Sequence, residues 1–415
     1  MIEQIETVII GGGPAGLSTS YYLDQYNKEH VILERYDKVA HPWQNERWDS
    51  FTLVTPNWAL FRMPECESYG EPPHGYLPKN KIVKFFESYV EKHNFPVQYN
   101  TNVISVEASN GDGYIIKTDG KSIKAKNVVV ATGFLRNPRI PKLSKKISNE
   151  ILQIHSGKYR NPDLLPEGAV LVVGSAQSGT QQAEELHNSG RKVFLCVGSA
   201  GRLPRRYRGK DIVQWMEEMG MFDLTLEQIP PGMPKFHAIP QLTGKNGGYT
   251  INLHKFAQDG IILLGRLKDT ESNKLFIAPD LHNSLAMVDQ TESEAVNMID
   301  QYIQQLKLDM PEEELPVLKD GYKQPLIEEL DLKAENIHTI IWAGGYDWDY
   351  SFVKVPVFDR DRFPIQNNGV TNSPGLCFVG MPWMPSERTA FLVGISEGAK
   401  NVADHISGTR SAAVN

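Results

Sequence analysis

The sequence predicts an α/β protein with two three-layer units of the Rossmann type, one inserted within the other. Residues 6–10 (ETVII) and 169–173 (AVLVV) are short apolar runs, and each leads directly into a glycine-rich turn and a helical pattern. A chain of 415 residues is also too long for one compact core, because domains usually hold about 100–200 residues. We therefore expect two large α/β units.

The composition is that of an ordinary globular protein. Apolar residues make up 40% and charged residues 22%, and the net charge of −7 predicts no nucleic-acid partner. The cysteines Cys66, Cys196 and Cys377 form neither a CxxC pair nor a metal-ligand spacing, so no metal site is predicted. The chain has no run of 18 apolar residues and enters a predicted strand soon after Met1, so we expect a cytoplasmic protein without a membrane partner.

The first glycine-rich turn fits the pattern GxGxxG at Gly11, Gly13 and Gly16. In this pattern the first glycine permits the turn, the second admits a pyrophosphate and the third packs the helix on the strand. Glu34 ends the next predicted strand, about 20 residues on, where a carboxylate binds ribose hydroxyls and repels a 2′-phosphate. The turn therefore predicts a dinucleotide site, and a βαβ turn without a ligand is the alternative.

A second turn, at Gly174, Ala176 and Gly179, has the related pattern GxAxxG. The following strand, residues 192–198 (KVFLCVG), ends without an acid. The loop after it carries Arg202, Arg205, Arg206 and Arg208. Because guanidinium groups suit a 2′-phosphate, this unit predicts NADPH, with NADH possible. The alternative is that these arginines form a solvated surface.

Two such units, with the acid in the first, resemble the two-dinucleotide-binding flavoproteins, in which FAD occupies the first unit and NAD(P)H the second. Residues 128–133 (VVVATG) resemble their second FAD motif, and residues 341–346 (IWAGGY) resemble the ATGY motif of flavin-containing monooxygenases. Residues 376–384 resemble the last FAD-domain strand, where Met381 follows Gly380 instead of the usual Asp of disulfide reductases. The chain therefore resembles a divergent bacterial branch of the flavin-containing monooxygenases.

A fingerprint of these monooxygenases, FxGxxxHxxx(Y/W), is half present before the second unit. His155 and Tyr159 occupy its His and aromatic positions, whereas Asn149 and Ile151 stand where Phe and Gly are expected. The resemblance gives His155 a place in the fingerprint. The alternative is a linker histidine that hydrogen-bonds backbone groups.

Residues 43–58 resemble the stretch that lines the isoalloxazine ring in these enzymes. The resemblance implies that Trp43 covers the flavin, with Arg47 and Trp48 beside it. It makes Asn57, Arg47 and Thr55 the catalytic candidates, although the aromatic residues of this stretch are alternatively core residues. The motifs and the resemblance together assign FAD to Gly11, Gly13, Pro14, Ala15, Gly16, Glu34, Arg35, Trp43, Arg47, Trp48, Ala131, Thr132, Gly133 and Gly380. They assign NADPH to Gly174, Ser175, Ala176, Ser178, Gly179, Arg202, Arg205 and Arg206.

These matches place an FAD domain in residues 1–165 and 335–415 and an NAD(P)H domain in residues 166–334. The resemblance implies an FAD-dependent, NAD(P)H-oxidising monooxygenase that uses O2 and a C4a-(hydro)peroxyflavin to oxygenate a small nitrogen-, sulfur- or carbonyl-containing substrate. Two alternatives stay open: an NAD(P)H:acceptor flavin reductase or oxidase, and a flavin-binding redox sensor with little turnover. A homodimer is expected from the family alone.

Overall fold

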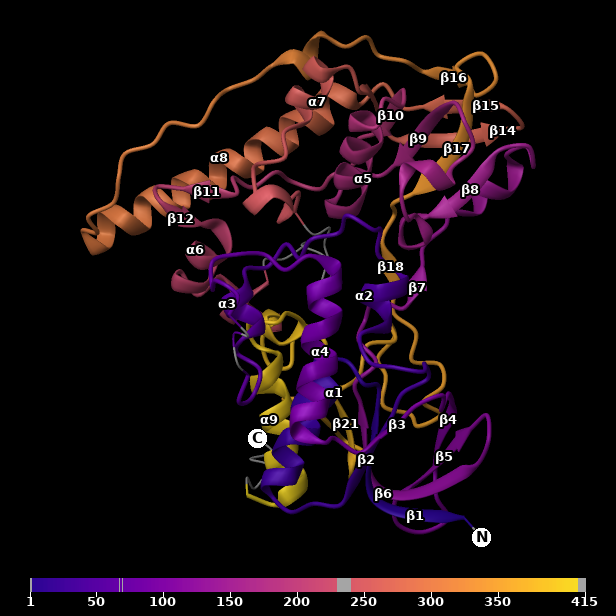
Figure 1. Ribbon diagram of the computed structural model, residues 1–415, viewed down its shortest axis with the longest axis vertical. Coiled ribbons are helices and arrows are strands. Elements are labelled where there is room, and N and C mark those ends of the chain that lie inside the picture. The colour runs from indigo at the N-terminus through magenta and orange to yellow at the C-terminus, as the bar shows by residue number, and fades with distance from the viewer. Residues whose placement is uncertain (1, 67, 69, 230–239, 410–415) are drawn as a thin grey trace.

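The computed structural model describes residues 2–66, 68, 70–229 and 240–409. It has two lobes, each built around its own sheet (Figure 1). The first lobe holds the N-terminus and the C-terminal helix, and the second is formed by the middle of the chain. No helix among the described residues is long and apolar enough to cross a bilayer.

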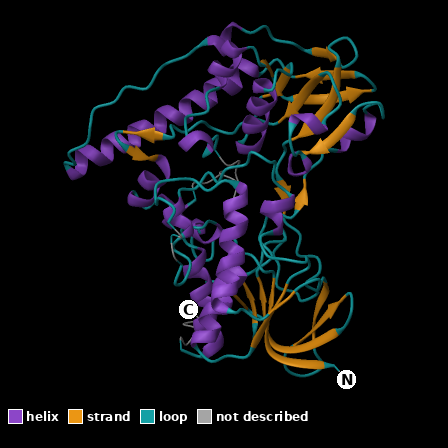
Figure 2. Cartoon of the chain, in the orientation of Figure 1, coloured by secondary structure: helices purple, strands orange, loops and turns teal. Residues whose placement is uncertain are grey.

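The first sheet has a parallel centre in the order β21-β6-β1-β2-β3. These strands are β1 (Glu3–Ile10), β2 (His30–Leu33), β3 (Val97–Gln98), β6 (Ser122–Val130) and β21 (Leu376–Phe378). Antiparallel strands extend it: β4 (Val103–Ala108), β5 (Tyr114–Thr118), β19 (Gln366–Asn367) and β20 (Val370–Thr371). The helices α1 (Pro14–Gln25), α4 (Lys79–His93) and α9 (Ile395–Ser407) lie together on one side of the sheet (Figure 2).

The second sheet is parallel throughout, in the order β13-β10-β9-β17-β8. Its strands are β8 (Leu152–His155), β9 (Ala169–Val173), β10 (Val193–Cys196), β13 (Ile262–Leu264) and β17 (Ile337–Trp342). Most of its central residues are fully buried, as expected for parallel strands covered on both faces. The helix α5 (Gln177–Asn188) follows β9, as the sequence predicts.

The membership of this sheet changes the predicted boundaries between the units. The strands β8 and β17 fall in stretches that the sequence assigned to the FAD domain, but both pair with other strands of the second sheet. The second unit therefore begins before residue 152 and ends after residue 342, and not at residues 166 and 334. The reason is that strand pairing is non-local, so an apolar run next to a boundary does not reveal which sheet it joins.

Two antiparallel strands, β7 (Asn137–Pro138) and β18 (Tyr346–Asp347), carry the chain between the lobes. A second connection is made by the segment after β10, which contains β11 (Arg206–Tyr207), β12 (Lys210–Asp211) and α6 (Ile212–Glu218). It shares a hydrophobic cluster with the first lobe, which includes Ala59, Trp215, Phe222, Ile299 and Val393. The two lobes are therefore joined on two sides.

The remaining helices are α2 (His41–Asn45), α3 (Asn57–Leu60), α7 (Leu253–Asp259) and α8 (Leu281–Leu306). A small sheet of β14 (Leu267–Glu271), β15 (Lys274–Ile277) and β16 (Glu329–Asp331) flanks the second lobe. Single turns of 3-10 helix occur at Lys142–Lys146, Ser156–Lys158, Pro162–Leu164, Met221–Asp223, Leu226–Gln228, Lys245–Gly247, Asp320–Lys323 and Glu387–Ala390.

Candidate functional site

The two glycine-rich turns occupy the same place in their units, at the carboxyl end of the central parallel strand. The N–H of Gly11 donates to the carbonyl of Leu33 (2.9 Å), and the N–H of Gly174 donates to the carbonyl of Cys196 (3.2 Å). The φ angles of the two glycines are +112° and +113°, in a region that side chains rarely adopt. The two turns therefore repeat one backbone arrangement.

Close backbone contacts explain why the outer glycines of each turn are required. A Cβ on Gly16 would lie 2.0 Å from the carbonyl oxygen of Gly11, and one on Gly179 would lie 1.9 Å from that of Gly174. Any side chain at either position would push the helix off its strand. The predicted role of the third glycine in each motif, helix-on-strand packing, agrees with these distances.

In each unit, the end of a neighbouring strand lies against the glycine-rich turn. A Cβ on Gly11 would lie 2.7 Å from the carbonyl oxygen of Ala131, and one on Gly174 would lie 2.6 Å from that of Ala343. The structure thus brings the end of β6 against the first turn and the end of β17 against the second. Residues 341–346, which the sequence placed with the FAD domain, run from the end of β17 past the second turn.

The N-terminus of α1 forms an open cradle. Gly13 precedes the helix with φ −84° and ψ −177°, and a Cβ added to it would meet nothing within 4 Å. Pro14 opens the helix, which has no side-chain cap and no acidic residue in its first turn. Its first N–H groups and its dipole are therefore suited to an anion. Gly380, which follows β21, lies against the same turn. A Cβ added to Gly380 would lie 2.8 Å from the Cβ of Ala15.

The helix α5 repeats this arrangement with one difference. Ala176 precedes the helix with φ −75° and ψ −173°, again without a side-chain cap or an acidic first turn. Its methyl group stands where Gly13 leaves open space. Ser175 and Ser178 lie in the same turn, as the sequence predicts, and Ser175 is almost fully buried.

The residue that follows the second strand differs between the units. Glu34 follows β2, and its Oε2 accepts a hydrogen bond from the N–H of Gly12 (2.8 Å). By strand register the equivalent residue after β10 is Val197, which is fully buried. Next to it the N–H of Gly198 donates to Oγ of Ser175 (2.9 Å). One unit therefore presents a carboxylate beside its turn, and the other presents an apolar residue and a hydroxyl group.

Two donors near the first turn are buried, of which Thr132 was assigned to FAD from the sequence and Arg136 was not. The hydroxyl oxygen of Thr132 and Nη1 of Arg136 are buried without a hydrogen-bond partner among the described residues. Burial lowers the pKa of Arg136, and the nearby charge of Arg35 lowers it further. The guanidinium of Arg136 also lies over the ring of Phe352, 5.3 Å from its centroid. Buried unpaired donors beside a second cation indicate a site for an anionic group.

Gln241 is a further residue that the sequence did not indicate. Its side chain is fully buried, and Nε2 donates to the carbonyl oxygens of Ser175 (3.0 Å) and Ala200 (3.1 Å). Its Oε1 has no partner among the described residues. Gln241 thus ties together the two loops of the second dinucleotide unit. It comes from a segment far downstream of both loops, so no local motif could reveal it.

The arginines assigned to the 2′-phosphate are mostly engaged inside the protein. Arg202 is 4% exposed, and its Nη2 donates to the carboxylates of Asp289 and Glu292 (2.7 Å each). Its Nε and Nη1 have no partner among the described residues. Arg205 is 1% exposed and forms an ion pair with Asp211 (2.6 Å), so it is not open to a phosphate.

Arg206 is exposed, and its guanidinium donates to the carbonyls of Gly247 and Gly248. The expectation that these arginines are open to a 2′-phosphate is therefore corrected, because Arg202 and Arg205 are buried against carboxylates.

The aromatic residues predicted to line the flavin pack against neighbours. Trp43 is half-buried and stacks on Phe86, with ring centroids 4.9 Å apart and planes at 16°. Trp48 is 3% exposed and packs edge-on against Phe51 at 5.1 Å. Trp48 is thus a core residue in this structure, which was the alternative for this stretch.

The catalytic candidates lie near the contact between the two lobes. Asn57 is 1% exposed, and its Nδ2 donates to the carbonyl of Pro72 (2.9 Å) while Oδ1 has no partner among the described residues. Thr55 and Arg47 are half-buried. Burial raises the pKa of Tyr346, and the charge of Arg47 opposes that rise, which places Arg47 next to the crossing strands.

Both ring nitrogens of His155 form hydrogen bonds with backbone groups in this structure. It is 3% exposed, its Nδ1 accepts from the N–H of Gly157 (3.1 Å), and its Nε2 donates to the carbonyl of Gly345 (2.9 Å). This pattern fixes the proton on Nε2 and leaves the ring neutral. Burial also lowers the pKa of His155. The ring holds the end of β8 against the start of the crossing strands.

A model of the family described as "Pyridine nucleotide-disulphide oxidoreductase" matches residues 8–221, which is more than half of the chain. The chain belongs to this family. Relatives in it include the uncharacterized oxidoreductase CzcO-like of Geobacillus kaustophilus, 29% identical over 97% of this chain and 98% of its own. The probable indole-3-pyruvate monooxygenase YUCCA1 of Arabidopsis thaliana is 31% identical, over 49% of this chain and 49% of its own.

Solved structures resemble this chain over nearly its whole length. A flavin-containing monooxygenase from Stenotrophomonas maltophilia has a TM-score of 0.65 at 17% identity and covers 98% of this chain and 99% of its own. The bacillithiol disulfide reductase from Bacillus cereus has a TM-score of 0.61 at 17% identity, over 98% and 100%. These likenesses confirm the predicted fold of two dinucleotide-binding α/β units.

The thiols of this family member are poorly suited to disulfide chemistry. The three cysteines, all among the described residues, form no disulfide, and burial raises the pKa of both Cys196 and Cys377 to about 12. Cys66 is half-buried and far from both in sequence. A nucleophilic thiolate with a resolving partner is therefore not formed by these residues.

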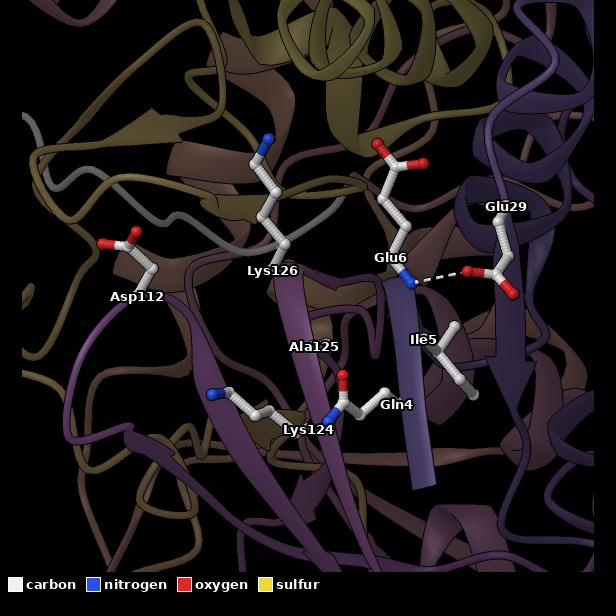
Figure 3. Close-up of a pocket in the computed structure, with 8 residues that line it drawn as sticks. All are labelled: Gln4, Ile5, Glu6, Glu29, Asp112, Lys124, Ala125 and Lys126. Atoms are coloured by element: carbon white, nitrogen blue, oxygen red, sulfur yellow. Dashed lines mark hydrogen bonds between the residues drawn. The ribbon is translucent and has the colours of Figure 1, made fainter. Parts of the chain in front are cut away.

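A shallow surface hollow of about 350 Å³ lies at the opposite end of the first sheet from the glycine-rich turn (Figure 3). Glu6, Glu29, Lys124 and Lys126 surround it, and the N–H of Glu6 donates to the carboxylate of Glu29 (3.1 Å). The hollow lies at the amino end of β1, whereas dinucleotides bind at the carboxyl ends of parallel strands. It is not part of the candidate site.

Proposed function

We propose that the protein is an FAD-dependent, NAD(P)H-oxidising monooxygenase that acts on a small nitrogen-, sulfur- or carbonyl-containing molecule. The observation that carries the proposal is the contrast between Glu34 and Val197 at the same register of two repeated turns. A carboxylate suits the ribose of FAD, and its replacement by an apolar residue removes the group that would repel a 2′-phosphate. Two units that differ in this way suit two different dinucleotides.

The first unit offers a matched set of groups for FAD. The open space at Gly13 and the uncapped start of α1 would take the pyrophosphate, and Glu34 would hold the ribose. The unpaired donors of Thr132 and Arg136 would supply further hydrogen bonds to the cofactor. Bound FAD would provide the hydride acceptor and the place where O2 is reduced.

The second unit suits NADPH better than NADH. Val197 leaves no carboxylate at the ribose position, and Arg202 lies five residues further along the same loop. Its Nε and Nη1 remain unpaired although its Nη2 is bound by two carboxylates. Arg202 is therefore the arginine with donors left for a 2′-phosphate. Arg205 has no such role, since its guanidinium is used in full.

An NAD(P)H:acceptor reductase or oxidase is the second candidate, and the position of Asn57 favours it. Its Nδ2, the donor that would stabilise an oxygen species, is bound to the carbonyl of Pro72. If this bond persists during turnover, Asn57 is not available to assist oxygen transfer.

One experiment separates the two candidates. The purified holoenzyme is reduced anaerobically with NADPH and with NADH, and air is admitted in the presence of an amine, a thioether or a cyclic ketone. A monooxygenase should be reduced faster by NADPH, and with its substrate class it should release less than one peroxide per NADPH and give a product heavier by one oxygen. Stoichiometric peroxide with every class of substrate would instead establish the oxidase or reductase.

A further inference from the structure

The Arg205 side chain joins the two lobes. Its Nε and Nη2 donate to the carboxylate of Asp211 at 2.8 and 2.6 Å, both within the segment after β10. Its Nη1 crosses to the first lobe and donates to the carbonyl of Val54 (2.8 Å). Arg205 is 1% exposed and Asp211 is 7% exposed. All three nitrogens of the Arg205 guanidinium group thus donate hydrogen bonds to other groups of the protein.

Tyr76 completes the cluster from the side of the first lobe. Its hydroxyl group donates to Oδ2 of Asp211, and its ring lies under the guanidinium of Arg205, 4.7 Å from the centroid. The contact between lobes is also close at the backbone. A Cβ on Gly244 would lie 2.0 Å from the carbonyl oxygen of Leu53. The hydrogen bond from Arg205 and the close approach of Gly244 therefore both fall on residues 53–54, and the cation–π contact with Tyr76 holds the same guanidinium group in place.

This cluster lies away from the strands that carry the chain between the lobes. Figure 1 shows β11, β12 and α6 on one side of the molecule, near α3, and β7 and β18 on the other. A pair of crossing strands alone would leave the lobes free to turn about them. The Arg205 cluster gives the lobes a second point of attachment, directly before the catalytic candidates Thr55 and Asn57.

We propose that Arg205 is a positioning residue, which with Asp211 and Tyr76 fixes Val54 and the following Thr55 and Asn57 relative to the nucleotide-binding second unit. The inference rests on the proposed function, because hydride transfer requires the two bound cofactors to be aligned. Misplacement of reacting groups by about 1 Å can lower a rate on the order of 100-fold. Arg205 touches neither cofactor in this account. It acts through the backbone of Val54.

The test uses three variants of the holoenzyme and a matched control. The double variant R205M/D211N removes the ion pair without leaving a buried charge. R205K keeps a charge but loses the Nη1 hydrogen bond to Val54. Y76F removes only the hydroxyl group. The control is K210M, which breaks the ion pair of Lys210 with Glu218 of α6 (2.6 Å), where both residues lie within the segment after β10. FAD content and Tm are measured for each variant.

Stopped-flow anaerobic reduction then separates rate from affinity. We expect R205M/D211N and R205K to lower the limiting rate of flavin reduction by at least 10-fold, with the Kd of NADPH within about 3-fold of the original and with K210M unchanged. An unchanged rate combined with a Kd that rises for NADPH but not for NADH would assign Arg205 to the 2′-phosphate and overturn the proposal. An R205K variant that matches the original in both rate and Kd would also overturn it, since a purely structural ion pair would suffice.

Hydrogen exchange gives an outcome that does not depend on turnover. Peptides covering residues 53–57 should exchange faster in R205K and Y76F than in the original protein and in K210M. If the original protein is not reduced by either nucleotide, the proposed function fails while this measurement still tests the attachment. Unchanged exchange in both variants would refute the positioning role even if Tm and activity were altered.

Discussion

Replacement of Gly13 by alanine should separate cofactor binding from folding. The backbone angles of Gly13, φ −84° and ψ −177°, are accessible to alanine, and the added Cβ meets no protein atom within 4 Å. The apo protein should therefore fold normally. Its stability should even rise by about 0.4–1 kcal/mol, because alanine restricts the unfolded chain more than glycine does.

FAD binding should be weakened by the same methyl group, since it enters the space proposed for the pyrophosphate. Losing one hydrogen bond from the helix N-terminus to a charged phosphate costs about 1.5–3 kcal/mol. With about 1.4 kcal/mol per factor of ten, the Kd of FAD should rise about 10- to 100-fold. Gly16→Ala is the contrasting variant, because its Cβ would lie 2.0 Å from the carbonyl oxygen of Gly11 and should disrupt the fold itself.

Titration of apo protein with FAD, followed by flavin fluorescence, measures the affinity, and thermal unfolding of the apo forms measures stability. Two results would refute the reasoning: a Gly13→Ala variant that binds FAD as tightly as the original, or one that unfolds like Gly16→Ala. The first would place the pyrophosphate elsewhere. The second would show that the open space at Gly13 is required by the fold.

Two further predictions concern single residues. Arg136→Met should weaken FAD binding about 10-fold in the same fluorescence titration without lowering the apo Tm, whereas a loss of Tm alone would make the residue structural. Burial lowers the pKa of His155, so the unfolded state binds its proton more readily and stability should fall as the pH drops below about 6.5. His155→Gln should flatten that slope in urea unfolding between pH 7 and 5, and an unchanged slope would assign it to other groups.

The features that could be predicted from the sequence are those with local causes. A left-handed turn followed by a close helix-strand contact allows only glycine at Gly11 and Gly16, so these residues mark the first turn without knowledge of the rest of the chain. The same reasoning found the second turn and its position after an apolar strand. The place of Glu34 beside the first turn could be predicted because in such motifs an acid follows the second strand at a fixed spacing.

The features that could not be predicted depend on which groups the tertiary structure brings together. An arginine in a polar loop has the same local pattern whether it faces solvent or a buried carboxylate. Arg202 is bound by carboxylates of α8, and Arg205 by Asp211 and the backbone of the other lobe. Burying such charges is costly unless they are paired, so the choice between the two outcomes is made by the tertiary structure. The boundary error at β8 and β17 has the same origin.

A substitution in the second turn, Ala176→Gly, is the opposite of Gly13→Ala in the first turn. Ala176 occupies the equivalent position before α5, so its methyl group stands in the space that would otherwise receive the phosphates of the nicotinamide cofactor. Ala176→Gly should therefore lower the Kd of NADPH several-fold, although glycine at this half-buried turn costs up to about 1 kcal/mol of stability. The Kd is taken from the concentration dependence of anaerobic flavin reduction, and Ala176→Ser serves as the bulkier control. Weaker binding by the glycine variant would show that the methyl group contacts the nucleotide favourably and that the two turns, although alike in backbone, hold their phosphates differently.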